Sequence, residues 1–315
     1  MLGYDHLDRA LVRRPAELVD VDDETWSRLA DAADGPGMRP VAQAAWRNGQ
    51  VFLEAADALR GRRPLRIEWK GGHRAPGPTP VPVDLRADHV FLVSCKYASR
   101  ILLNSAPARL FDGAAEAGRD WYVEVARDET QALYEVARAE LAADVELPPF
   151  VGDLAAHHRK ALKPVMAERD WGAAGAAAYA ELAAAVGRES AARWRAALSS
   201  KRRREAELWR LLRVTDAPYF VLGTSGDHVL RVRVATPWDW RRRYDLKALE
   251  VWGAEAGQPQ VGWRATVFDR EAGAERPVEG HVEVRWSHGR FAQPPEAKVY
   301  LDTPHHRVPG YEPLS

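Results

Sequence analysis

Six short segments in the C-terminal third constrain the fold most, because apolar and polar residues alternate along each of them. Alternation with a period of two is typical of strands that bury one face and expose the other. Turn-forming residues separate the segments, which favours an antiparallel sheet or a small barrel. The six segments are YFVLGTS (219–225), HVLRVRVAT (228–236), LKALEVWG (246–253), VGWRATVFD (261–269), GHVEVRWSHG (280–289) and EAKVYLDT (296–303).

Two further blocks precede this β-rich one, and together they suggest three domains. Residues 147–214 are rich in alanine and predict helices with almost no strand. Residues 1–146 mix both patterns and predict an α/β domain. A chain of 315 residues exceeds what one hydrophobic core comfortably serves. We therefore expect domains at 1–146, 147–214 and 215–315.

Within the first block, the expected order is helix, three strands, helix, strand and helix. The expected elements are a helix over 41–61, strands over 64–72, 83–86 and 89–97, helix or loop over 98–118, a strand over 120–128 and a helix over 129–144. The second and third strands predict an antiparallel hairpin around residues 87–89.

Composition places the chain among ordinary soluble proteins. The formal net charge is zero, so any site for a polyanion has to be a local patch. One cysteine excludes an internal disulfide and fits a reducing cytosol. No apolar stretch is long enough to span a bilayer or to serve as a signal peptide. We expect a cytoplasmic protein with no membrane partner.

A carboxylate and a lysine flank the predicted hairpin. Asp84 opens it, and the apolar strand HVFLVSCKY ends near Ser94, Cys95 and Lys96. If the chain turns at 87–89, these groups meet at one edge of a sheet. A carboxylate there suits Mg²⁺, and an adjacent lysine can activate water and stabilise charge on a phosphoryl oxygen.

This pattern resembles the PD-(D/E)XK restriction-endonuclease-like nucleases over residues 40–145. The resemblance implies a restriction-endonuclease-like core in the N-terminal domain and a Mg²⁺ or Mn²⁺ cofactor. It makes Asp84 the first acid, Lys96 the catalytic lysine and Glu54 the helix-borne glutamate. The family's second acid falls on Ser94, so a metal ligand is missing unless Ser94 Oγ, the Cys95 carbonyl, Glu54 or Glu68 replaces it.

Two alternatives remain open at this site. Glu68 and Lys70 form a Glu-x-Lys on the preceding strand, which offers a second candidate pair. A degenerate site that binds without cutting is the other. Each chemical interpretation also has a plainer one, since Asp84 suits a turn and Lys96 suits a strand edge. Cys95 without a basic partner suits the core.

Several residues predict contact with nucleic acid, although a solvated surface explains most such groups. Tyr97, Ser99, Arg100 and Asn104 follow the lysine and offer polar groups to a phosphate. Two basic runs carry Arg202, Arg203 and Arg204 and, with aromatic neighbours, Trp238, Trp240, Arg241, Arg242 and Arg243. The second run is expected in a loop between strands. The adjacent pairs His157–His158 and His305–His306 cannot chelate one metal from a helix, and we expect them at the surface.

The sequence therefore favours a Mg²⁺-dependent DNA endonuclease of restriction or phage-defence type. Two active sites for two strands would make a homodimer plausible, and a partner defence subunit could regulate the enzyme. A nucleic-acid-binding or assembly subunit with a degenerate core is the first alternative. A small-molecule binding protein that uses the Trp-rich β domain is the second, and residues such as Trp252, Trp263 and Trp286 would then line its pocket or its core.

Overall fold

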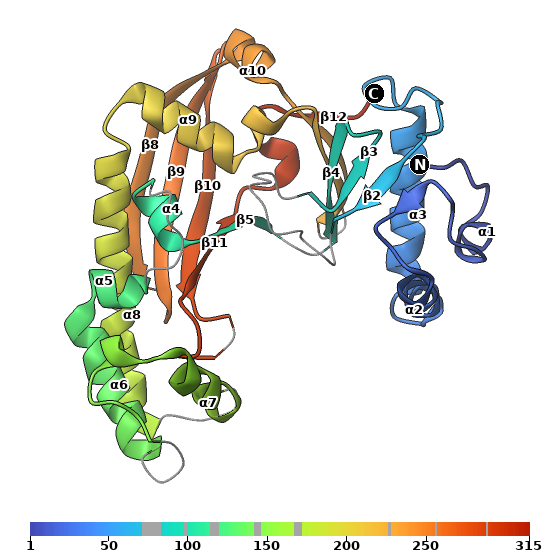
Figure 1. Ribbon diagram of the computed structural model, residues 1–315. Helices are drawn as coiled ribbons and strands as arrows, with labels where there is room; N and C mark the ends of the chain where they lie inside the picture. The colour runs from blue at the N-terminus through green and yellow to red at the C-terminus, as the bar shows by residue number, and fades with distance from the viewer. Residues whose placement is uncertain are drawn as a thin grey trace.

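The computed structural model describes most of the chain (Figure 1). The described residues are 1–70, 83–97, 100–113, 120–141, 146–166, 172–225, 228–255, 257–287 and 289–315. Within them the fold is mixed α/β, with ten α-helices, one mixed sheet and one antiparallel sheet. Among the described helices, none combines the length and apolar character needed to span a membrane.

The first sheet has seven strands in the order β1-β2-β3-β4-β6-β7-β12. Its strands are β1 (Leu18–Val19), β2 (Ile67–Trp69), β3 (Leu85–Ala87), β4 (Phe91–Tyr97), β6 (Tyr219–Ser225), β7 (His228–Val234) and β12 (Tyr311–Pro313). The β2–β3 and β3–β4 pairs are antiparallel, whereas β4 and β6 are parallel. Parallel strands need a long crossover, and the chain between them supplies one that contains β5 and most of the helices.

The second sheet is antiparallel, in the order β5-β11-β10-β9-β8. Its strands are β5 (Ile101–Ser105), β8 (Tyr244–Glu255), β9 (Pro259–Asp269), β10 (Ala274–Arg285) and β11 (Glu296–Leu301). On its covered face, alternate residues such as Trp263, Val282 and Val299 are fully buried. This is the pattern expected when one face packs on helices and the other does not.

The helices cover the two sheets separately (Figure 1). The helix α3 (Arg39–Glu54) packs on the first sheet, where Phe52 meets Phe220 edge to face at 5.0 Å between ring centroids. The second sheet is covered chiefly by α8 (Gly172–Ala197) and α9 (Lys201–Leu211). The other helices are α1 (Leu7–Leu11), α2 (Asp23–Asp34), α4 (Pro107–Phe111), α5 (Trp121–Val125), α6 (Arg127–Leu141), α7 (Ala156–Met166) and α10 (Pro237–Arg243). Three 3₁₀ turns are η1 (Val151–Asp153), η2 (Val214–Asp216) and η3 (His305–Arg307).

Many predicted elements are confirmed. The helix expected over 41–61 is α3, although it ends at Glu54 and turns follow up to Gly61. The hairpin of 83–86 and 89–97 is β3 and β4. The helical character of 147–214 and the strands of the C-terminal third are also confirmed.

Three predictions were wrong. Residues 120–128 were expected as a strand but form α5 and the start of α6, because Trp121 and Tyr122 are buried against α8 and β10. Residues 101–105 were expected as helix or loop but form β5, which pairs with β11. The loop expected around Trp238 is α10, which begins after Thr236.

Sheet membership also crosses the predicted block boundaries. The strands β6, β7 and β12 come from residues 215–315 but extend the sheet formed by residues 1–146. In the other direction, β5 comes from the first block and joins the second sheet. Consequently, the strand that continues this sheet beyond β4 is β6, and the helical segment lies between β4 and β6 in the sequence.

Candidate functional site

Asp84 and Ser94 meet where β3 and β4 pair. The Asp84 Oδ2 atom accepts the backbone N–H of Cys95 at 2.6 Å and the Ser94 hydroxyl at 3.2 Å. The Asp84 carboxylate therefore accepts a backbone hydrogen bond from β4 in place of a carbonyl of a neighbouring strand. Ser94 is buried, with 2% of its surface exposed. The predicted proximity of Asp84 to this end of β4 is confirmed by these contacts.

Lys96 lies two residues beyond Ser94, on the same face of β4 because side chains alternate along a strand. It is half-buried. Burial lowers the pKa of Lys96, Asp84 acts in the opposite direction, and Arg213 lowers this pKa further. Within the described residues, the Lys96 ammonium has no ion pair or hydrogen bond, so its charge is available to an anion.

Cationic groups gather around Lys96 from distant parts of the chain. His305 of η3 is 3% exposed, and burial lowers its pKa to about 4, with added repulsion from Lys96, Arg100 and His306. Arg213 is also 3% exposed and donates through Nη2 to the Leu102 carbonyl at 2.8 Å. The charged groups of this region are therefore Lys96, Arg100 and Arg213, because His305 with a pKa of about 4 is neutral at neutral pH, and Arg213 is paired with Asp216 at 3.4 Å.

A metal fits this donor set only in part. Asp84 supplies one carboxylate whose Oδ2 already accepts two hydrogen bonds, one of them from the Ser94 hydroxyl. Across the described part of the chain, no group of three His, Cys, Asp or Glu side chains could hold a metal ion. Asp84 Oδ1 carries neither of these two bonds, whereas Ser94 Oγ also has a hydrogen bond with the Tyr219 side chain.

The alternative pair, Glu68 and Lys70, is occupied by its own ion pairs. Lys70 Nζ lies 2.9 Å from Glu68 and 3.1 Å from Asp20. Arg86 also binds Glu68, at 2.5 Å, and His89 lies 2.7 Å from it. Burial raises the pKa of Glu68, but the bonds to Lys70 and Arg86 outweigh burial and lower it overall. This cluster joins β2 and β3 and leaves Glu68 no oxygen directed at Lys96.

Three other predicted site residues lie away from the Lys96 ammonium. Cys95 packs its side chain against the α3 side of the sheet, and burial raises the pKa of its thiol to about 12. Tyr97 is on the same side, where its hydroxyl accepts from Asn48 at 3.0 Å. Glu54 is exposed at the end of α3, the helix on that opposite side. The structure does not bring Glu54 to the metal position expected of it. The ligand expected from Cys95 was its backbone carbonyl, which the position of this thiol does not test.

The residues after Lys96 diverge. Arg100 is exposed and belongs to the cationic region described above. Asn104 lies in β5 of the second sheet and donates to Glu296 at 3.3 Å. Ser99 lies outside the described residues.

The two basic runs face each other on α9 and α10. Arg241 pairs with Glu205 at 2.8 Å and lies 4.4 Å from the Trp209 ring centroid. Arg243 pairs with the buried Asp269 at 3.1 Å. Arg203 and Arg204 donate to groups at the end of α8, at Ala197, Leu198 and Ser199. These contacts support the interpretation of both runs as paired surface, with exposed Arg202 and Arg242 as the freer members.

The tryptophans divide between core and surface. Trp240 is fully buried and donates to the Pro309 carbonyl at 3.2 Å, so it cannot stack on a base as predicted. Trp263 is fully buried as well. Trp238 and Trp252 are 66% and 42% exposed. Of these four tryptophans, Trp238 and Trp252 are the two whose rings are largely open to solvent.

Sequence reasoning missed Arg213 and His305 as neighbours of Lys96. The pair His305–His306 was expected at the surface, but His305 is buried. No local signal marks these residues, since each comes from a turn more than a hundred positions along the chain from Lys96. Arg213 has a left-handed φ of 63°, which no sequence pattern announces for arginine.

Known proteins give no further guidance, because no protein-family model, curated protein or solved structure matches the chain.

Proposed function

We propose that the chain is a nucleic-acid-binding protein built on a restriction-endonuclease-like core, and that it contacts phosphate at Lys96 with an incomplete metal-ligand set. The observation that carries the proposal is the charge balance around the half-buried Lys96. Arg213 lowers the pKa of Lys96, and Lys96 and Arg100 both help to keep the buried His305 neutral. Asp84 is the carboxylate that acts on Lys96. A phosphate would relieve the repulsion, and a partly desolvated ammonium binds an anion more strongly than an exposed one.

The order of elements supports the core. The helix α3 is followed by β2, β3 and β4, then by β5 of the second sheet and a series of helices, and then by β6 beside β4. This is the helix–three strands–helix–strand order of the nuclease resemblance, with β6 in place of residues 120–128 as the last strand. Ser94 stands where the resemblance requires the second acid, which supports binding over cutting.

A salt series tests the proposal. Fluorescence anisotropy of labelled duplex and single-stranded DNA, and of RNA, should give affinities that fall steeply between about 50 and 200 mM salt. Lys96→Ala should weaken binding to every sequence alike and lower the salt slope by about one. Lys160→Ala, at an exposed position on α7, is the matched control and should leave the slope unchanged. Absence of salt-dependent affinity for DNA and RNA would refute the proposal.

The second candidate is the Mg²⁺-dependent endonuclease of restriction or phage-defence type. It is favoured by the hydrogen bond from Ser94 to Asp84 and by the electrostatic attraction of Asp84 for Lys96. Mg²⁺ is often held by one or two carboxylates together with substrate phosphates and water, so Asp84 Oδ1 would be its protein ligand. The metal would polarise the phosphate when bound. Lys96 would stabilise negative charge on a phosphoryl oxygen, and a homodimer would place one such site on each strand.

A further inference from the structure

The face of the second sheet opposite α8 carries a row of rings. Trp252 on β8 is the partner of Gly262 on β9, which in turn is the partner of His281 on β10. His281 is the partner of Tyr300 on β11. The row therefore crosses four neighbouring strands, and strand alternation places it on the side opposite the buried Trp263.

The rings are held in fixed positions. A Cβ on Gly262 would lie 2.4 Å from Trp252 Cε2, so the indole lies flat over the glycine. One indole face is against the sheet, and Trp252 remains 42% exposed. The His281 ring stacks on Tyr300 at 4.8 Å with 10° between their planes, and its Nδ1 is 2.8 Å from Asp302. Because these rings are already fixed, little side-chain conformational entropy is lost when a planar ligand stacks on them.

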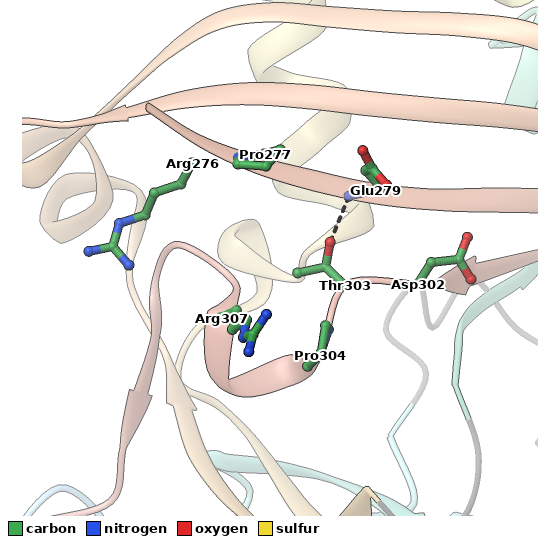
Figure 2. Close-up of a pocket in the computed structure, with 7 residues that line it drawn as sticks. All are labelled: Arg276, Pro277, Glu279, Asp302, Thr303, Pro304 and Arg307. Atoms are coloured by element: carbon green, nitrogen blue, oxygen red, sulfur yellow. Dashed lines mark hydrogen bonds between the residues drawn. The ribbon is translucent and has the colours of Figure 1, made fainter. Parts of the chain in front are cut away.

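A hollow of about 560 Å³ lies next to His281, because Asp302, which is 2.8 Å from His281, is one of its lining residues. Figure 2 shows the residues that line it. It is lined by Pro277 and Glu279 of β10, by residues 302–304 and by two arginines, Arg276 and Arg307. Glu279 pairs with Arg264 at 2.7 Å, and Asp302 lies 2.8 Å from His281, so both carboxylates have cationic partners or a histidine beside them.

The hollow carries a cation at its edge. Arg307 lines it, is exposed and, among the described residues, forms no ion pair. It belongs to η3, the turn that also carries the buried His305. A phosphate at the hollow would therefore meet a guanidinium that no carboxylate pairs with in this part of the chain.

We infer that this face binds single-stranded nucleic acid, with a base stacked on Trp252 and a phosphate further along the same strand at Arg307. The inference rests on the proposed function and adds the class of nucleic acid. Bases stack on aromatic side chains only when they are not held inside a duplex. The fixed rings can stack unpaired bases, and the cation at the edge of the face can pair with a phosphate. This face therefore suits a single strand.

The test compares a labelled oligothymidine of about 15 nucleotides with a duplex of the same length, by anisotropy. Trp252→Ala should weaken oligothymidine binding on the order of tenfold and change duplex binding less than about twofold. Trp252→Phe should keep most of the affinity, because phenylalanine still offers a ring face to stack on. Phe150→Ala, which removes a ring that is 62% exposed and lies in neither sheet, is the matched control and should change neither.

The outcomes separate the two claims. Oligothymidine binding that is unchanged in Trp252→Ala, together with Lys96-dependent duplex binding, would overturn this inference and leave the proposed function standing. No binding of the wild-type protein to either ligand would overturn both. Urea unfolding of each variant identifies loss of fold as the cause of any weak binding, and Trp252→Phe then carries the comparison.

Discussion

Replacing Asp84 separates a structural role of this carboxylate from a chemical one. Its Oδ2 atom holds the Cys95 N–H at 2.6 Å and the Ser94 hydroxyl at 3.2 Å. Asp84→Ala removes the atom that accepts both hydrogen bonds, and the Tyr219 side chain remains as a hydrogen-bond partner of Ser94. Asp84→Asn keeps an amide oxygen that can accept from Cys95 but removes the charge.

The magnitude follows from these two bonds. A hydrogen bond to a charged group contributes about 1.5–3 kcal/mol, and a buried donor left without an acceptor costs about 1–3 kcal/mol. Ser94 is 2% exposed, so water compensates poorly for its lost acceptor. We expect Asp84→Ala to lower the free energy of unfolding by about 3 kcal/mol and Asp84→Asn by about 1 kcal/mol.

Urea denaturation followed by fluorescence measures both values. The midpoint should fall while the slope stays unchanged, because the surface exposed on unfolding is the same. Asp57→Ala, at a half-buried carboxylate in the turn after α3, is a control for losing an acidic residue outside the site. An Asp84→Ala protein as stable as the wild type would show that the carboxylate does not hold β4, and the structural reasoning would be wrong.

Three other variants test the surroundings of the site. Lys96→Met should be more stable than the wild type at neutral pH, because burial lowers the pKa of Lys96 and so disfavours its charged form in the native state. Urea unfolding across pH should show this gain in stability shrinking towards pH 10.5, where the unfolded wild type no longer binds more protons at Lys96 than the native state does. Between pH 6.5 and about 4, His305 is protonated in the unfolded state but not in the native state, which lowers the free energy of unfolding of the wild type by about 3 kcal/mol. His305→Gln should remove this loss. If the variant loses stability in acid as the wild type does, the burial argument is wrong. Gly223→Ala should prevent folding or cost at least about 3 kcal/mol, since its Cβ would lie 1.8 Å from the Lys96 carbonyl oxygen, whereas Gly37→Ala, with nothing within 4 Å, should be near neutral in thermal unfolding.

Local sequence patterns predicted the elements that depend on neighbours in the chain. The β3–β4 hairpin follows from alternation around a short turn. The contact between Asp84 and the end of β4 follows from the same turn. One helix was missed although its signal was present, since Thr236 caps α10 by accepting the Asp239 N–H at 3.2 Å and Pro237 occupies its first turn.

The remaining differences arise from contacts between distant segments. The segment 121–125 is rich in strand-forming residues, yet Trp121 donates to Ser190 at 2.9 Å and Tyr122 to Val284 at 2.5 Å. These buried bonds outweigh a propensity of roughly 1 kcal/mol. The parallel pairing of Ser94 with Val221 likewise depends on a long crossover that no local pattern describes. Arg213 and His305 are likewise brought toward Lys96 by contacts between segments that are distant in the sequence.

One experiment decides most directly whether the site binds without cutting. Supercoiled and linear DNA and RNA that the protein binds are incubated with it in Mg²⁺, Mn²⁺ or EDTA, and the wild type is compared with Asp84→Ala and Lys96→Ala. The account predicts binding that depends on Lys96 and no cleavage above the EDTA control with either metal. Metal-dependent cleavage by the wild type that both variants lose would contradict it and establish Asp84 and Lys96 as the active pair of a nuclease.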